Sequence, residues 1–319
     1  MLAASVLWGT TGTAATFAPG VGPLAVGAVA MGLGGLLQAL AAARQIARDT
    51  GRLREQRGTV LLGAVSVAVY PLAFYSSMHL AGVATGTVVS IGTAPLASTI
   101  IERVLDNRRL TRRWLLAATL GLLGTALLCL AQADQATHTT HTPDGTGRTS
   151  VAATLLGVAL GLVAAVTYAL YSWAAHRLIT RRIPSRAAMG AVFGLGGLLL
   201  LPVLLVTGGP LVASWSNAVV GAYMALVPMF AGYVLFGWGL ARVPASTATT
   251  LSLLEPAVAA VLAVVIVGER LSAVGWTGLA LIVACLTVLT APTLTVRRRR
   301  RPPTESAAER AVVDGGFSV

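Results

Sequence analysis

The sequence predicts an all-α integral membrane protein whose ten transmembrane helices form two inverted five-helix repeats. Three observations support this fold class. Hydrophobic residues make up 55% of the 319 residues and charged residues only 11%, whereas a soluble domain carries about 25% charged residues. Runs of about 17 or more residues without a charge recur along the chain, each long enough to cross ~30 Å of hydrocarbon. A match between the two halves of the chain completes the argument.

Ten uncharged runs are predicted to span the membrane. The first begins almost at Met1 without a positively charged segment or a small-residue cleavage site before it, so we expect a span rather than a signal peptide. The predicted spans are 2–18, 23–43, 58–78, 85–102, 114–131, 151–174, 187–206, 217–240, 246–267 and 273–292.

The basic residues predict the orientation of these spans. All 23 are arginines, and they give the chain a net charge of +12. If the N-terminus is cytoplasmic, only Arg148 and Arg270 fall on the outer side. This is the positive-inside pattern, and it predicts a multi-pass protein of the inner (plasma) membrane with both termini in the cytoplasm. Nucleic-acid binders gather their basic residues on a folded polar face, so we exclude a nucleic-acid partner.

Residue types that are absent or sparse exclude several functions. A chain without lysine has no Walker A loop and no Schiff-base lysine. The two cysteines, Cys129 and Cys285, lie in apolar runs and exclude a disulfide framework. His138 and His141 stand in a threonine-rich segment that rarely forms a metal site. We therefore expect no cofactor and no metal.

Composition divides the chain into four parts. Two five-helix repeats, 1–131 and 151–292, flank a polar extracytoplasmic linker, 132–150 (QADQATHTTHTPDGTGRTS). Residues 293–319 form a basic tail with five consecutive arginines, which we expect to be disordered and attracted to anionic lipid headgroups.

The internal match aligns Pro95 with Pro256. It places LAGVATGTVVSIGTAP (80–95) over ARVPASTATTLSLLEP (241–256), two apolar segments spotted with Thr and Ser. Five helices in each half turn the second half upside down relative to the first. This inverted repeat is typical of secondary transporters.

At this point the chain resembles the ten-helix EamA-type members of the drug/metabolite transporter superfamily. The resemblance rests on LWGTTG (7–12), the APL of the fourth span, SLLEPAVAAVLAVVIVGERLS (252–272) and GWTGLALIVACLTVL (275–289). Amino-acid exporters of the threonine/homoserine type carry a similar pattern in the ninth span. The resemblance implies a transporter of a small molecule, most often an exporter, driven by protons, another ion gradient or exchange.

Glu255 is the one acid near the middle of a predicted span. A charge at that depth costs at least ~2.5–3.5 kcal/mol, so the carboxyl must face a cavity, be protonated or find a partner. It either binds a proton or a substrate ammonium group, or it caps backbone groups that Pro256 frees. Pro95 and Pro256 each remove a helical hydrogen bond and predict paired hinges, or ordinary kinks.

Other polar and aromatic side chains could line the same path. Thr249 and Ser252 share a helix face with Glu255, and Ser90 and Thr93 form a similar stripe in the fourth span. Such hydroxyls can instead bond to their own helix. Three aromatic residues are predicted to contact substrate, although packing explains them equally well: Trp8, Tyr168 and Tyr171.

The predicted function is therefore secondary active export of an amino acid or related metabolite by alternating access. Multidrug or toxic-compound efflux is the alternative that the residues do not separate from it. An intramembrane enzyme is disfavoured because no HExxH, no GxSxG and no paired intramembrane acids occur. A receptor or scaffold is disfavoured because paired broken helices have no obvious use in it. The sequence leaves the oligomeric state open.

Overall fold

A computed structural model of the chain describes residues 1–107, 111–139, 151–267 and 272–291, and all regular structure there is helical. Contacts divide the chain into Met1–Leu289 and Thr290–Val319, and the described helices lie almost wholly in the first unit. The predicted linker from residue 140 onward and the predicted tail from 293 onward lie outside the described residues.

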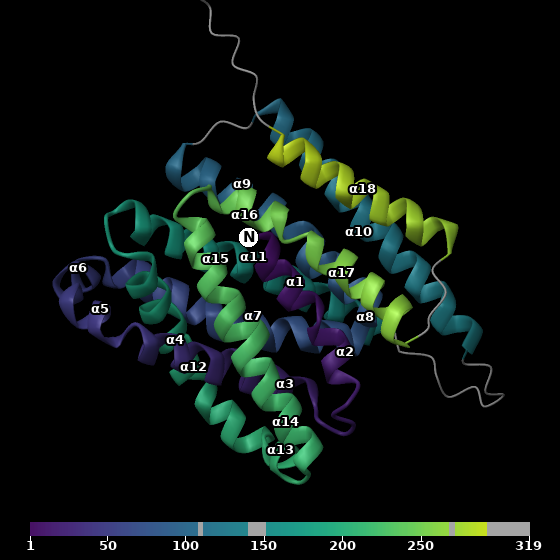
Figure 1. Cartoon of the computed structure of the whole chain (residues 1–319), viewed down its shortest axis with the longest axis horizontal. Helices are drawn as coiled ribbons and strands as arrows, with labels where there is room; N and C mark the ends of the chain where they lie inside the picture. Colours follow the sequence, from purple (N-terminus) through teal and green to yellow (C-terminus); the bar gives the residue numbers. More distant parts are fainter. Residues whose placement is uncertain (108–110, 140–150, 268–271, 292–319) are drawn as a thin grey trace, which may run out of the picture. The chain divides into compact units, whose positions relative to one another are not determined.

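The helices follow one another with short connections (Figure 1). Those of the first half are α1 (Leu2–Gly9), α2 (Thr11–Ala15), α3 (Pro23–Gly27), π-helix η1 (Ala28–Leu33), α4 (Gly34–Ala41), α5 (Ala43–Arg48), α6 (Thr50–Glu55), α7 (Arg57–Ala81), α8 (Val83–Thr87), π-helix η2 (Val88–Gly92), α9 (Thr93–Asp106) and α10 (Arg112–Thr139). Those of the second half are α11 (Val151–Thr180), α12 (Ser185–Thr207), α13 (Gly209–Val212), α14 (Trp215–Met224), π-helix η3 (Ala225–Ala231), α15 (Gly232–Leu240), α16 (Ala245–Leu251), α17 (Leu254–Leu262), π-helix η4 (Ala263–Val267) and α18 (Ala273–Thr290).

Nine helical stretches within the described residues are long and apolar enough to cross a membrane. They confirm the all-helical, multi-pass class, and each corresponds to a predicted span. Several extend a few residues beyond the prediction, because a helix can continue past the hydrocarbon as long as its backbone bonds are satisfied. The nine are Pro23–Ala41, Arg57–Ala81, Thr85–Asp106, Arg112–Ala131, Val151–Thr180, Ser185–Thr207, Trp215–Leu240, Ala245–Ile266 and Ala273–Thr290.

The tenth predicted span, 2–18, is divided into the short helices α1 and α2 and is therefore not among the nine. The interruption lies in the sequence WGTTG. The hydroxyl of Thr10 donates to the Leu7 carbonyl at 2.6 Å, and that of Thr11 donates to the Trp8 carbonyl at 2.7 Å. Hydroxyls bonded to the preceding turn compete with the helical hydrogen bonds and bend the chain.

Small residues allow the spans to pack closely. α7 lies along α11, and α12 lies along both α4 and α7. A Cβ atom added to Gly194 of α12 would lie 2.5 Å from the Ala39 Cβ, and one added to Gly157 of α11 would lie 2.7 Å from the Ala81 Cβ. Such backbone-to-backbone approach is how helices associate in lipid, where apolar surfaces gain nothing from leaving water.

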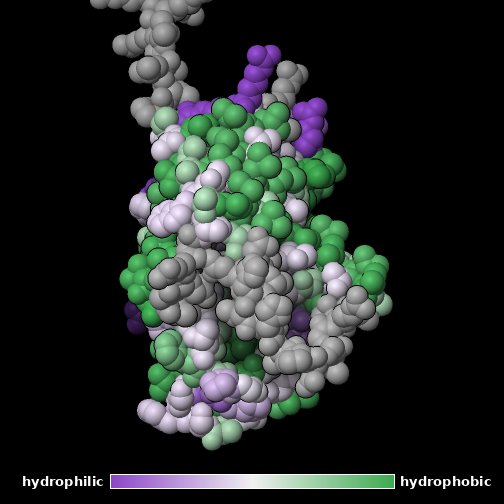
Figure 2. Space-filling view, turned by 90° about the vertical axis from the view of Figure 1, so that its right-hand side faces the viewer, coloured by the Kyte–Doolittle hydropathy of each residue, from purple (hydrophilic) through white to green (hydrophobic). Residues whose placement is uncertain are grey.

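The surface is apolar where a soluble protein would be polar. Large aliphatic side chains such as Leu205 (83% exposed) and Val206 (85%) point outward. On the face drawn in Figure 2, hydrophobic residues cover much of the surface, and strongly hydrophilic residues gather mainly at its upper end. Exposed apolar area on this scale indicates contact with lipid.

Candidate functional site

A small cavity lies where α1, α7, α11 and α17 approach one another. The space open to the centre of a water molecule is about 20 Å3, which is room for one or two waters. A small metabolite would require the cavity to widen, because ligand pockets have volumes of several hundred Å3. The lining residues are Trp8, Thr11, Met31, Tyr70, Pro71, Phe74, Tyr75, Tyr168, Met229, Tyr233 and Glu255.

Glu255 contributes the one carboxylate among these lining residues. It stands in the first turn of α17, directly after the chain leaves helical geometry at Ser252 and Leu253. Its backbone N–H donates to the Ser252 carbonyl at 2.9 Å. Among the described residues, the side chain has no hydrogen bond and no salt bridge, and it remains partly exposed. The carboxylate is therefore turned toward the cavity and caps no backbone group in this structure.

Aromatic rings form most of the wall opposite this carboxylate. The rings of Trp8 and Tyr233 lie 4.8 Å apart, and those of Tyr70 and Tyr168 lie 5.5 Å apart. Tyr70 also stacks on Phe74 at 5.6 Å. The faces of aromatic rings carry negative electrostatic potential and attract cations. The cavity thus combines two features that favour a positively charged group.

A chain of hydroxyls connects the wall to the interrupted helix. The Tyr168 hydroxyl donates to Ser252 Oγ at 2.8 Å, and Ser252 Oγ donates to the Thr249 carbonyl at 2.8 Å. The hydroxyls of Tyr171 and Tyr233 share a hydrogen bond of 2.7 Å. These contacts connect α11 to α15 and to the break between α16 and α17.

Several elements that line the cavity depart from ideal helix. Met31 belongs to η1, Met229 belongs to η3, and Pro71 interrupts the bonding of α7. The indole Nε1 of Trp8 donates to the carbonyl of Pro228 in η3 at 2.9 Å. π-Helical segments occur frequently at functional sites, and non-helical backbone inside a membrane is tolerated where it is buried in protein or lines a cavity.

The profile of the EamA-like transporter family matches residues 1–130 and 155–291, most of the chain. The chain belongs to the EamA-like transporter family. It is a membrane transporter and not an enzyme, and the resemblance inferred from the sequence motifs is confirmed.

Relatives of this EamA-like chain have names that describe transport. It is 32% identical over 292 residues to the uncharacterized transporter YwfM of Bacillus subtilis, covering 91% of this chain and 92% of that protein. The threonine/homoserine exporter RhtA of Escherichia coli is 28% identical over 249 residues, covering 78% and 75%. A probable terminal-alkyne amino-acid exporter of Streptantibioticus cattleyicolor is 26% identical over 318 residues, covering 95% and 99%. A crystal structure of a protein 23% identical in sequence shares the fold with a TM-score of 0.69, covering 90% of this chain and 94% of that one.

The cavity of this EamA-like protein brings together three of the residues that the sequence singled out: Trp8, Tyr168 and Glu255. Two more lie just behind its wall. Ser252 accepts the Tyr168 hydrogen bond, and the ring of Tyr171 lies 5.2 Å from that of Tyr168.

The remaining hydroxyls singled out from the sequence do not line the cavity. Thr249 donates to the carbonyls of Ala245 (3.1 Å) and Ser246 (3.0 Å) of its own helix, and Thr93 donates to the Val89 carbonyl at 2.5 Å. The hydroxyl of Ser90, inside η2, is fully buried without a partner. Hydroxyls that bond to their own helix have no donor left for a ligand.

The two prolines occupy equivalent positions after a departure from α-helix. Pro95 is the third residue of α9, which follows η2. Pro256 is the third residue of α17, which follows the interruption at 252–253. Pro256 falls in the first turn after a break, where its missing N–H leaves no helical bond unmade. Pro95 lies inside the continuous helical stretch Thr85–Asp106, where its missing N–H does remove a helical hydrogen bond.

Three tyrosines of the wall were missed by the sequence reasoning: Tyr70, Tyr75 and Tyr233. A signal was present for Tyr70. It stands directly before Pro71 and eight residues from the nearer end of the predicted span 58–78, whereas Tyr75 lies three residues from that end. Tyrosines that anchor a span lie near its ends, so the position of Tyr70 beside a proline points to the interior of the protein.

A second polar cluster lies at the arginine-rich ends of the helices. The buried carboxylate of Glu102 accepts hydrogen bonds from Ser246 N (3.1 Å) and Ser246 Oγ (2.7 Å) at the start of α16. Asp106 accepts from Trp173 Nε1 at 2.7 Å and pairs with Arg177 at 2.8 Å. These bonds join α9 of the first half to α16 and α11 of the second. No group of three metal-ligating side chains gathers anywhere in the described chain.

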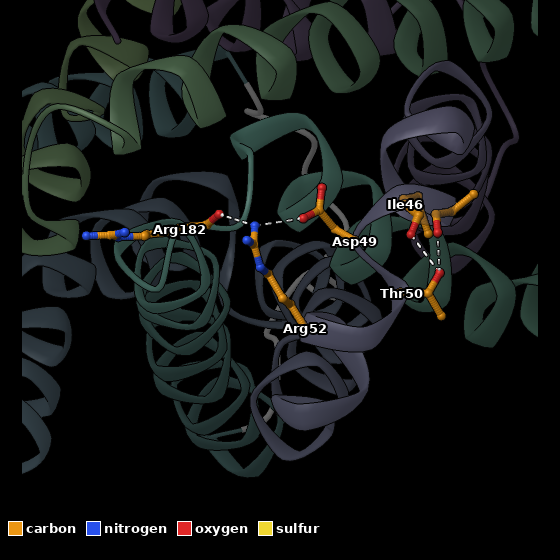
Figure 3. Close-up of polar contacts among 6 residues, drawn as sticks. Ile46, Asp49, Thr50, Arg52 and Arg182 are labelled. Atoms are coloured by element: carbon orange, nitrogen blue, oxygen red, sulfur yellow. Dashed lines mark hydrogen bonds and ion pairs between the residues drawn. The ribbon is translucent and has the colours of Figure 1, made fainter.

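A further contact joins the two halves at the α5–α6 segment (Figure 3). One guanidinium nitrogen of Arg52 contacts both the Asp49 carboxylate (3.1 Å) and the Arg182 carbonyl (3.3 Å). Arg182 has a positive φ of 64°, which turns the chain sharply between α11 and α12. The basic segment is thus helical and docked, where the sequence predicted only a connection between spans.

Proposed function

We propose that this transporter exports a small amino acid or a related metabolite by alternating access. The observation that carries the proposal is the unpaired carboxylate of Glu255, which faces a cavity walled by Trp8 and tyrosines. Two relatives named as exporters of amino acids support the substrate class.

The chemistry of the cavity suits a substrate ammonium group. A carboxylate that lacks a partner in a low-dielectric site gains most from an opposite charge, and aromatic faces add attraction for the same cation. Tyr75 also lines the cavity, and its hydroxyl can donate to a substrate carboxylate. Each end of an amino acid then has a partner.

Glu255 also offers a route to coupling. A single carboxylate binds either a proton or a substrate ammonium, so each displaces the other. If the protein changes orientation only with one of the two bound, substrate moves out as protons move in. Exchange of one substrate for another needs no proton, and the two modes differ in their response to a pH gradient.

Alternating access requires that the cavity open to each side in turn. Its volume of about 20 Å3 fits a contracted state between the two openings. The proposed ten-helix inverted repeat supplies a symmetric means of opening, and two separate family matches, at 1–130 and 155–291, support it. The interrupted helices around Pro95 and Pro256 are the proposed hinges.

Efflux of organic cations is a second candidate. The lining of the cavity includes no basic side chain to receive a carboxylate, which favours substrates that carry a positive charge alone. Proteoliposomes loaded with L-threonine should take up labelled L-threonine if the amino-acid proposal holds, and tetraethylammonium should not compete. Uptake of labelled tetraethylammonium without uptake of threonine would select the second candidate. No flux of either compound or of other amino acids would contradict both.

We further propose that the protein lies in the inner membrane with both termini in the cytoplasm, as the one-sided arginine distribution supports. Single cysteines introduced into 132–150, in a background with Cys129 and Cys285 replaced by serine, should react with an impermeant maleimide added to whole cells. Reaction only after permeabilisation would reverse the orientation.

A further inference from the structure

A second cavity lies away from Glu255, between α4, the start of α12, and η3 with α15. The space open to the centre of a water molecule is about 170 Å3, and no residue is shared with the central cavity. The lining residues are Gln38, Ala41, Ala42, Ser185, Arg186, Met189, Phe230, Val234 and Gly237. Gln38 lies near the end of the span Pro23–Ala41, and Ser185 begins the span Ser185–Thr207. The cavity therefore lies at the boundary between hydrocarbon and headgroups.

The amide of Gln38 is available to a polar ligand. Gln38 is 3% exposed, and neither its Nε2 nor its Oε1 has a hydrogen-bond partner among the described residues. Burying an amide without a partner costs several kcal/mol, and buried polar side chains nearly always find one. Because Gln38 lines the cavity, a polar group bound there could supply that partner.

The charges around Gln38 favour an anion. Arg186 lines the cavity, and no acidic side chain does. Ser185 and Arg186 also form the first turn of α12, a helix of 23 residues whose N-terminus has no side-chain cap. Uncapped N–H groups and the helix dipole attract negative groups to such an end. Gln38, Arg186 and the first turn of α12 thus border the same cavity and carry hydrogen-bond donors.

The opposite end of the cavity is apolar. Phe230 and Gly237 both line it, and seven residues of helix separate them, or about 10 Å along the axis. Val234 is 37% exposed and Ala41 is exposed, so the cavity also opens to the outside of the helix bundle. A ligand that fills it carries an anionic group at the polar end and hydrocarbon at the other.

We propose that this cavity binds one anionic phospholipid with a hydroxylated headgroup, of the phosphatidylglycerol type. Its phosphate lies at Arg186 and the first turn of α12, its headgroup hydroxyl meets the Gln38 amide, and the start of an acyl chain covers Val234 and Phe230. The excess of arginines at this end attracts anionic lipids to it. The lipid joins α4 of the first half to α12 and α15 of the second.

Native mass spectrometry of the full-length detergent-purified protein tests the site. Titration with phosphatidylglycerol should saturate one tight site. Phosphatidylcholine should bind it at least about tenfold more weakly, because it has no headgroup hydroxyl for Gln38 and its choline cation offsets the phosphate charge. Arg186→Gln should weaken phosphatidylglycerol binding about tenfold. The control Arg48→Gln removes an equally exposed arginine that does not line the cavity and should change nothing.

Gln38→Leu separates a ligand site from a packing defect. Without lipid this variant should melt at a higher temperature than the wild type, because an unpartnered amide has been removed. With saturating phosphatidylglycerol the order should reverse, because the wild type gains a hydrogen bond that the leucine cannot make. Equal lipid binding by Arg186→Gln and Arg48→Gln would overturn the proposal. Displacement of the lipid by millimolar inorganic phosphate would also overturn it, because that result would assign the cavity to a free anion.

Discussion

The spans Thr85–Asp106 and Ala245–Ile266 each contain a proline at the position where the two halves of the sequence align. The residues that precede the two prolines differ in their chemistry. Ala94 precedes Pro95 and is fully buried, and the preceding η2 keeps the chain helical. Glu255 precedes Pro256 and faces the cavity, and the chain before it is interrupted. The two proline positions thus differ, and the carboxylate that faces the cavity stands at the one where the helix is interrupted.

The comparison teaches that symmetry of the chain and symmetry of the site are separate properties. In the proposed alternating-access mechanism, helices that bend at both prolines would permit two matched openings. A single carboxylate avoids the repulsion of a second buried acid, which would raise the free-energy cost of burying both. The helix that follows the break at 252–253 also has a neighbour from the first half, since α1 packs against α17.

The largest stability effect is expected where α1 meets the second break. A Cβ atom at Gly9 would lie 2.7 Å from the Val258 Cβ and 3.0 Å from the Glu255 carbonyl. Gly9→Ala should therefore destabilise the fold by about 1–3 kcal/mol, seen as a lower melting temperature. Gly12→Ala is the matched control, because nothing lies within 4 Å of its added Cβ. Equal melting temperatures for the two variants would show that the close contact between α1 and the break contributes nothing to stability.

A somewhat smaller effect is expected at the start of α16. Glu102→Gln replaces a charged acceptor of two bonds from Ser246 with an amide that satisfies fewer of them, at a cost of about 1–2 kcal/mol. Ser246→Ala should cost less, because it removes only the hydroxyl bond. Glu55→Gln, exposed on α6, should leave the melting temperature unchanged. An unaltered Glu102→Gln protein would show that α9 does not hold the second break in place.

The smallest effect is expected when a single hydroxyl group is removed beside each of the two prolines. Tyr168→Phe removes the bond to Ser252 and should destabilise the protein by about 1 kcal/mol while slowing transport. Thr93→Val, in the first half, removes a hydroxyl that bonds only to its own helix and should change transport little. A Thr93→Val defect as large as that of Tyr168→Phe would mean that the first break also contacts substrate.

The sequence alone predicted a membrane-spanning protein, because the bilayer thickness sets the length of an apolar span. This length does not depend on how the helices pack against one another. It did not predict that the span 2–18 is divided into two short helices, because hydropathy carries no information on the hydroxyls of Thr10 and Thr11 that bond to the preceding turn. It also missed the helices of the arginine-rich segment after Ala42, which contacts the turn at Arg182 through Arg52.

The candidate site was predicted in part for a similar reason. Glu255 stood out because a charge at mid-membrane depth is costly wherever it faces. Hydroxyl and aromatic side chains carry no such penalty, so their sequence positions do not reveal which face of a helix meets a cavity. Tyr233 joined the wall and Thr249 did not, and only the packing of α15 and α16 decides between them.

The central claim is that Glu255 performs the chemistry of transport, and substrate flux through Glu255→Gln tests it most directly. The variant keeps the shape of the side chain and removes its titration and charge. Reconstituted beside Glu55→Gln, with insertion checked by size-exclusion chromatography, it should fold normally yet lose flux driven by a pH gradient by at least about tenfold. Full pH-dependent transport by correctly inserted Glu255→Gln, equal to that of Glu55→Gln, would contradict the account.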